Sequence, residues 1–275
     1  MCINFDIVID SEDYSVDMNS GLETLKGASE ATRQIATTLL TGQVPKKLTS
    51  TNKIRTKLRK TFKGSFGQEY SLEIECSALK KTYEDIGENV FSELVGYFIN
   101  EALYKESNKL SNKANNMISD LGEECHDELI EQLRKSSLER LHTISKNFKK
   151  NVKLRYRESD HKQATLADIN KDSYLSLVPV INRGKVDIVA SITRLNINTG
   201  NGRLLIPGQN ETVAFGFPSS YKDVKQAAKK KFSENLDSNN GIHSDKWKTL
   251  RLIAHTLRTK DGRIIKYLIE GILGD

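Results

Sequence analysis

Apolar and polar positions follow two different periods in the first 75 residues of the chain. Residues 5–9 are mostly apolar and run into an acidic turn, which is typical of a β-strand. Residues 21–40 place apolar side chains at helical spacing and end at a Thr-Gly pair, which predicts an amphipathic helix. After Pro45, a basic segment leads through the turn residues 64–67 into the alternating residues 70–75. This pattern predicts a β-hairpin whose first strand is basic.

Two helical patterns follow the hairpin. Residues 86–103 carry a broad apolar stripe, and we expect this helix, including Phe98, to be buried against the N-terminal sheet. Residues 117–148 carry a narrower apolar face whose spacing breaks near Ser136, so a sustained coiled-coil heptad is not predicted. The surface of residues 110–148 is nevertheless a candidate for self-association or for a protein partner.

From residue 151 onward the pattern is that of a β-rich domain. Residues 152–157 alternate cleanly, and residues 185–273 follow as three strands, a helix over 221–235 and two more strands. The turn residues Asn, Thr and Gly at 198–202 separate the first two of these strands. This order of elements is similar to that of the OB-fold and related small barrels. The resemblance covers the last third of the chain and implies a small closed barrel, whereas fold alone does not fix function.

The change of pattern predicts an α+β protein of two domains. Residues 1–150 are expected to form a small sheet with long helices, and residues 151–275 an OB-like β-barrel domain. A chain of 275 residues is long enough for two cores. The strand and acidic segment at residues 5–17, with the helix after them, also resemble bacterial proteins of unknown function, including ones linked to mobile elements.

Composition excludes several classes of protein. The longest apolar runs, such as residues 186–192, fall far short of the ~20 residues that a membrane span needs. The N-terminus lacks the basic and apolar stretches of a signal peptide, so we expect a cytoplasmic protein that does not enter a membrane. Cys2, Cys76 and Cys125 are odd in number and far apart, which argues against a disulfide framework and against a thiolate zinc site.

The common catalytic motifs are absent from the sequence, which has no phosphate-binding P-loop, no dinucleotide fingerprint, no nucleophile elbow and no HExxH pair. The carboxylates between Asp6 and Asp17 are of a type that binds Mg²⁺, but an acidic solvated turn is the favoured interpretation. The acids around Cys125, at residues 123–128, are more typical of a solvated helix face than of a metal site. We therefore predict no catalytic residues, no metal and no cofactor.

Charge is distributed unevenly along the chain, which carries a net charge of +6. The first thirty residues are acidic, whereas residues 46–63 and the predicted barrel are basic. Lysine neutralises phosphate and aromatic faces stack on bases, so basic clusters with nearby aromatics favour single-stranded nucleic acid as a partner. The candidate contact residues are Lys57, Arg59, Lys60, Lys229, Lys230, Lys231, Lys246, Trp247, Lys248, Arg251, Arg258, Lys260 and Arg263.

Additional candidate aromatics are Phe215, Phe217 and Tyr267, although two of these, Phe215 and Phe217, equally suit the interior of a barrel. The leading hypothesis is a non-enzymatic nucleic-acid-binding or accessory protein that uses a basic barrel surface. One alternative is an interaction or assembly subunit of a bacterial or phage defence-related system. Another is a metal-dependent enzyme whose site has no familiar motif.

Overall fold

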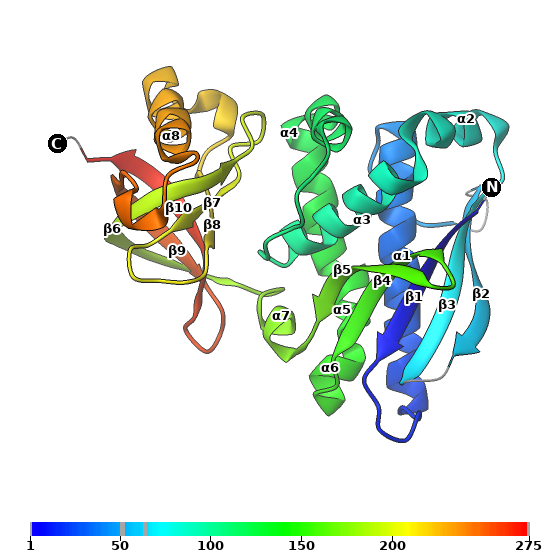
Figure 1. Ribbon diagram of the computed structural model, residues 1–275. Coiled ribbons are helices and arrows are strands. Elements are labelled where there is room, and N and C mark those ends of the chain that lie inside the picture. Colours follow the sequence, from blue (N-terminus) through cyan, green and yellow to red (C-terminus); the bar gives the residue numbers. More distant parts are fainter. Residues whose placement is uncertain (1, 50–52, 63–64, 274–275) are drawn as a thin grey trace. The chain divides into compact units, whose positions relative to one another are not determined.

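The chain forms two compact units in the computed structural model, which describes residues 2–49, 53–62 and 65–273. Unit 1 comprises Met1–Leu103 and Ser107–Leu177, and unit 2 comprises Tyr104–Glu106 and Val178–Asp275. The predicted α+β class is confirmed (Figure 1). The second unit begins after residue 177 and not after residue 150 as expected, because the two strands that follow residue 150 belong to the sheet of unit 1.

The sheet of unit 1 is antiparallel, with the strand order β2-β3-β1-β4-β5. Its strands are β1 (Cys2–Ile9), β2 (Ile54–Phe62), β3 (Phe66–Ile74), β4 (Val152–Ser159) and β5 (Lys162–Ile169). The predicted hairpin is therefore confirmed as β2 and β3, while residues 63 and 64 near its turn lie outside the described residues. The first four strands, with helices after β1 and after β3, have the order of a double split β-α-β fold.

Helices pack on one face of this sheet, and Figure 1 shows α1 and α5 behind it. The helices of unit 1 are α1 (Met18–Thr41), α2 (Ser77–Ile86), α3 (Glu88–Ala102), α4 (Asn112–Lys135), α5 (Ser137–Leu141), α6 (Thr143–Phe148) and α7 (Lys171–Leu175). The predicted first helix is confirmed as α1, which ends at Gly42 in the left-handed conformation. An added Cβ at Gly27 would lie 2.2 Å from the backbone nitrogen of Leu141, so α1 and α5 meet backbone to backbone.

Alternation along β1 separates the two faces of the sheet. Ile3, Phe5 and Ile7 are fully buried on the helix-covered face, where the ring of Phe5 stacks on Tyr70 with centroids 5.4 Å apart. Asp6 points to the opposite face because successive side chains of a strand alternate. The helix-covered face thus builds the core, and the other face carries polar side chains.

The two predicted helical stretches are both divided. Gly87, with a φ of 86°, separates α2 from α3, and the stripe that includes Phe98 is fully buried, as expected. The stretch 117–148 falls into α4, α5 and α6, with a break at Ser136 and a non-helical residue at Gly122. Its apolar side chains, among them Leu133, belong to the core of unit 1. Internal packing therefore uses the apolar face that had suggested a partner surface at residues 110–148.

Unit 2 contains a closed ring of strands in the order β10-β8-β7-β6-β9. Its elements are β6 (Val180–Leu195), β7 (Gly202–Leu205), β8 (Val213–Gly216), the short 3₁₀ turn η1 (Tyr221–Asp223), α8 (Gln226–Asn239), η2 (Ser244–Lys246), β9 (Leu250–Arg258) and β10 (Ile264–Ile272). The single parallel pairing joins β8 to β10, and the other four pairings are antiparallel. In order of sequence the ring runs first, second, third, fifth, fourth, with the helix between the third and fourth strands, as the OB-like pattern implies.

Aromatic side chains fill the interior of this barrel. Phe215 is fully buried and stacks on Phe232 of α8, and Phe217 meets Phe232 edge to face at 5.4 Å. Tyr267 is also buried. The interpretation of Phe215 and Tyr267 as base-stacking residues is therefore wrong, because both rings are used in the core.

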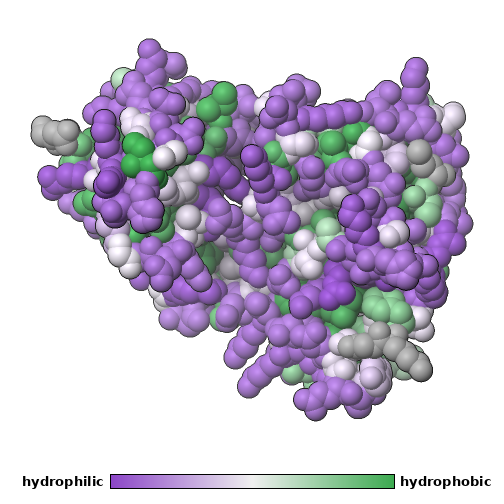
Figure 2. All heavy atoms as spheres, viewed as in Figure 1, coloured by the Kyte–Doolittle hydropathy of each residue, from purple (hydrophilic) through white to green (hydrophobic). Residues whose placement is uncertain are grey.

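The surface seen in Figure 2 is mostly hydrophilic over both units, with apolar residues in small scattered patches. Within the described part of the chain, no helix is long and apolar enough to cross a membrane.

Candidate functional site

The cations predicted to contact nucleic acid lie in three groups. The first is on β2 in unit 1, the second is on α8 and around the start of β9, and the third is at the β9–β10 turn. Since β9 has nine residues and each advances the chain by about 3.3 Å, its two ends are about 26 Å apart. The groups are Lys57, Arg59 and Lys60; Lys229, Lys230, Lys231, Lys246, Lys248 and Arg251; and Arg258, Lys260 and Arg263. The second and third groups, both in unit 2, do not form one continuous patch.

The β2 group is neutralised by neighbouring carboxylates. Lys57 Nζ lies 2.5 Å from Glu73 Oε2, and Arg59 donates to Glu73 Oε1 at 2.7 Å. Lys60 Nζ lies 3.0 Å from Asp160 Oδ1. The hydrogen bond from Lys57 lowers the pKa of Glu73, and the one from Lys60 lowers the pKa of Asp160. These three cations therefore have carboxylate partners within the chain.

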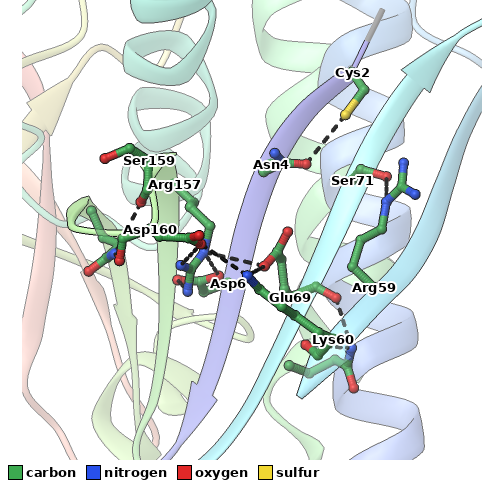
Figure 3. A network of polar contacts seen from close by, with 12 residues as sticks. Cys2, Asn4, Asp6, Arg59, Lys60, Glu69, Ser71, Arg157, Ser159 and Asp160 are labelled. Atoms are coloured by element: carbon green, nitrogen blue, oxygen red, sulfur yellow. Dashed lines mark hydrogen bonds and ion pairs between the residues drawn. The ribbon is translucent and has the colours of Figure 1, made fainter. Parts of the chain in front are cut away.

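The centre of the polar sheet face is a buried ion pair between strands β1 and β4 (Figure 3). Arg157 donates from Nε to Asp6 Oδ1 at 2.7 Å and from NH2 to Asp6 Oδ2 at 2.8 Å, and Asp6 is only 1% exposed. The guanidinium also lies 3.3 Å from Asp160 and stacks over the ring of Phe62. Two-pronged geometry of this kind is the strong form of a charged hydrogen bond.

Glu69 completes this network without a hydrogen bond to its buried Oε2 atom. That oxygen lies 3.7 Å from Arg157 Nε and 3.8 Å from Lys60 Nζ. The guanidinium of Arg157 therefore lies within 4 Å of the carboxylates of both Asp6 and Glu69. No group of three or more His, Cys, Asp or Glu side chains in the described residues is arranged to hold a metal.

The acidic segment after β1 serves local structure. Asp13 accepts hydrogen bonds from the hydroxyls of Ser11 and Ser15, and these bonds lower the pKa of its carboxyl. Asp17 accepts from the backbone nitrogen of Ser20 and so caps α1. These two acids are used in a turn and at a helix terminus.

The acidic segment around Cys125 does not form a metal site among the described residues either. His126 is buried, with Nε2 3.0 Å from the hydroxyl oxygen of Tyr97. Cys125 Sγ instead faces the carbonyl oxygen of Gly42 at 3.7 Å. Adjacent residues of α4 therefore point into different surroundings.

The α8 group differs from the β2 group in its electrostatics. Lys230, Lys231, Lys246 and Lys248 are exposed and form no ion pair with any described residue. Lys229 is partly covered and lies over the ring of Tyr221, with Nζ 4.7 Å from the centroid. This end of unit 2 therefore has cations with no carboxylate partner.

Two asparagines that sequence reasoning missed hold this region together. Asn235 accepts from the backbone nitrogen of Ile192 and donates to the carbonyl of Lys248. Asn239 accepts from the backbone nitrogen of Lys248 at 2.7 Å and donates to its carbonyl at 2.9 Å. Both side chains are buried on one face of α8, four residues apart. The four-residue spacing of these two asparagines, on a helix with few apolar residues, is the feature of the sequence that could have indicated their burial.

A cavity of about 560 Å³ lies beside these asparagines. It is lined by residues from the end of β6, from α8 and from the segment between α8 and β9. Trp247 forms part of the wall, and its Nε1 donates to the carbonyl of Ile242 at 2.8 Å. Of the predicted contact residues, Trp247 alone lines this cavity.

The third group is held within the β9–β10 turn. Arg258 donates to Thr256 Oγ1 at 3.0 Å and to the carbonyl of Gly262 at 3.1 Å. Gly262 has a φ of 92°, which a glycine accepts without strain. Lys260 and Arg263 are exposed on this turn.

A row of cations crosses the outer face of the barrel, and sequence reasoning missed two of its members, Arg194 and Arg203. Arg194 pairs with Arg203 across β6 and β7, and Arg203 is linked through Ala214 of β8 to Lys266 of β10. Arg203 is only 5% exposed and donates to the carbonyls of Thr212 and Tyr104. Arg203, the middle residue of this row, is thus held by one backbone carbonyl of the barrel and one of the segment Tyr104–Glu106.

Comparisons with protein-family models, curated proteins and solved structures give no match.

Proposed function

We propose that unit 2 binds single-stranded nucleic acid through the α8 end of its barrel. The observation that carries this proposal is the contrast between two groups of cations. Those on β2 are paired with carboxylates, whereas Lys230, Lys231, Lys246 and Lys248 are exposed and have no such partner among the residues that the structure describes. Unpaired lysines release counterions when they meet phosphate, which is the main source of affinity for nucleic acids.

An aromatic side chain accompanies these lysines. Trp247 stands between Lys246 and Lys248 in the chain and is held by its bond to Ile242. Asn239 fixes the backbone of Lys248 from both its nitrogen and its carbonyl. A positioned indole beside lysines is the combination that single-strand binders use, because every base has a face that can stack.

The test is binding of a labelled single-stranded oligonucleotide by the full chain, followed by fluorescence anisotropy over a salt series. Reversing Lys230, Lys231 and Lys248 to Glu should abolish binding at moderate salt. In the native chain log K should fall with log salt by about 0.7 per phosphate contact. The matched control reverses three exposed cations of unit 1, Lys81, Lys109 and Lys171, and changes the net charge equally.

The control should lower affinity far less than the α8 variant does. Equal losses in the two variants would show that only net charge matters, and the proposed surface would be wrong. No retention of DNA or RNA by the native chain at low salt would reject the function itself.

A protein-interaction role is the second candidate, favoured by one observation. The first part of β6 exposes Val180 and Ile181, which are 54% and 57% accessible, and there the strand pairs only with β9. Exposed apolar strand edges are sites at which another chain can add a strand. A mass measurement in solution, with Ile181→Lys as the variant, tests this role.

A further inference from the structure

We infer that the cavity beside Trp247 accepts one unstacked base of a bound single strand and favours a base with an exocyclic amino group. This inference rests on the proposed nucleic-acid function and adds to it a base-binding site and a preference. The cavity lies between α8, the end of β6 and the segment before β9, at the end of the barrel where the helix packs.

The size and lining of the cavity suit a flat ring. Its volume of about 560 Å³ is in the range of small-molecule sites and leaves room for a base and part of its sugar. Leu195, Leu236 and Trp247 supply apolar wall. Ile197 and Ile242, which also line it, are 69% and 44% exposed and add apolar surface that a ring could cover.

The hydrogen bond of Trp247 determines which part of the indole is available. Its only donor, Nε1, is already bonded to the carbonyl of Ile242. The ring therefore contacts a ligand through its apolar surface and not through a further hydrogen bond. Stacking is the interaction that such a surface offers to a base.

The polar groups of the lining suggest which bases fit. The exposed carboxylate of Asp237 borders the cavity and forms no hydrogen bond with any described residue. A carboxylate accepts from an amino group such as N4 of cytosine, and it repels the carbonyl oxygen that thymine carries at the same position. Thr193, also in the lining, has a buried hydroxyl oxygen without a partner.

Charge around the cavity suits a base that is attached to phosphates. Lys246 and Lys248 flank Trp247 in the chain, and Lys231 lies one helical turn before Asn235, which bonds to the carbonyl of Lys248. Asp245, the other acid of this segment, is engaged by His243 at 2.6 Å. A partly apolar cavity whose wall residue Trp247 has a lysine on either side in the chain is complementary to a ring that carries phosphate.

The experiment uses the fact that Trp247 is the only tryptophan of the chain, so its emission reports on this cavity alone. The full chain is titrated with oligonucleotides of equal length made of cytosine, of thymine or of abasic residues. Anisotropy of an end label reports total binding. We expect all three to bind, with strong quenching of Trp247 by the cytosine strand, weaker quenching by thymine and none by the abasic strand.

Two variants test the residues separately. Trp247→Ala should weaken binding of the cytosine strand on the order of 10-fold and leave the abasic strand unaffected. Asp237→Ala should abolish the preference for cytosine over thymine. Asp245→Ala is the control, because it removes the same charge nearby and should preserve the preference.

Each outcome decides between the two proposals. If the strands bind while Trp247 emission stays constant, the base site is wrong and the nucleic-acid function stands. Equal affinity for cytosine and thymine strands, with quenching by both, overturns the amino-group preference. If none of the strands binds, both proposals fail together.

Discussion

Arg157 and Asp6 are joined by two hydrogen bonds of 2.7 and 2.8 Å inside the polar face of the unit 1 sheet. The pair links β1 to β4, whose residues are about 150 positions apart in the chain. Breaking a buried ion pair on one side leaves an uncompensated charge, which costs more than the pair itself contributes.

Arg157→Leu should therefore lower the free energy of unfolding by about 3–5 kcal/mol, measured by urea titration. Arg155→Leu, on the same strand but with a half-buried side chain, is the control and should cost much less. Equal and small losses in the two variants would contradict a structural role for the buried pair.

Alkaline pH should unfold the protein through its buried tyrosines. Burial raises the pKa of the Tyr70 hydroxyl, whose oxygen lies 2.8 Å from the hydroxyl oxygen of Thr32. The unfolded chain ionises this group near pH 10, so its contribution to stability is complete below pH 10 and is lost as the pH rises above that value. Tyrosinate absorbance should report incomplete ionisation until unfolding occurs.

Tyr70→Phe keeps the ring that stacks on Phe5 and removes the ionisable group. The midpoint of alkaline unfolding should move to higher pH, at the cost of about 1 kcal/mol near neutrality for the lost hydrogen bond. An unchanged alkaline midpoint would show that other groups dominate.

Two helical glycines should respond in opposite directions to the same substitution. Gly27→Ala places a methyl group against the backbone of Leu141 and should destabilise the protein by about 1–3 kcal/mol. Gly96→Ala in α3 meets Leu166 only at 3.4–3.5 Å and should stabilise it by about 0.5–1 kcal/mol, since alanine is the better helix former. Thermal unfolding of both variants makes the comparison, and destabilisation of similar size in both would contradict it.

Asn235→Ala should loosen the α8 end of the barrel. The substitution leaves the backbone nitrogen of Ile192 without its acceptor and removes one donor to the carbonyl oxygen of Lys248. We expect a cost of about 1–3 kcal/mol. Asn240→Ala, at an exposed position just beyond the helix, should be nearly neutral. Hydrogen exchange of the Ile192 amide measures the effect, and protection equal to that of the native chain would refute it.

Local patterns predicted most elements, and long-range pairing accounts for the differences. The turn at residues 198–202 marked the boundary between the first two barrel strands, and the first three strands follow one another with short connections. The closure of the ring by β9 and β10, after the long segment that contains α8, was expected only from the similarity to the OB-fold. Alternation in 152–157 identified β4 as a strand but contains no information about its partner. Its pairing with β1 depends on the fold of the intervening chain.

For the candidate site too, the sequence indicated the types of residue but not their contacts. The lysines were visible as a charge pattern, but their partners were not: Arg59 meets Glu73 only through the register of the β2–β3 pair, which contains a bulge. The burial of Asn239 was not predicted, because it follows from how α8 packs on the barrel. Trp247 was predicted as a contact residue, whereas the cavity that it borders depends on β6 and could not be predicted.

Residues Tyr104–Glu106 belong with the barrel although they lie more than seventy positions before it in the sequence. Arg203 and Thr212 of the barrel bond to this early segment, at Tyr104 and Glu106. A gene fragment that encodes only residues 178–275 would therefore produce a barrel in which Arg203 loses an acceptor. During synthesis residues 104–106 leave the ribosome before the barrel strands do. They can bond to the barrel only after those strands have emerged. Recombination that exchanged the C-terminal part alone would separate it from three residues that it needs, so the two units are expected to be inherited together.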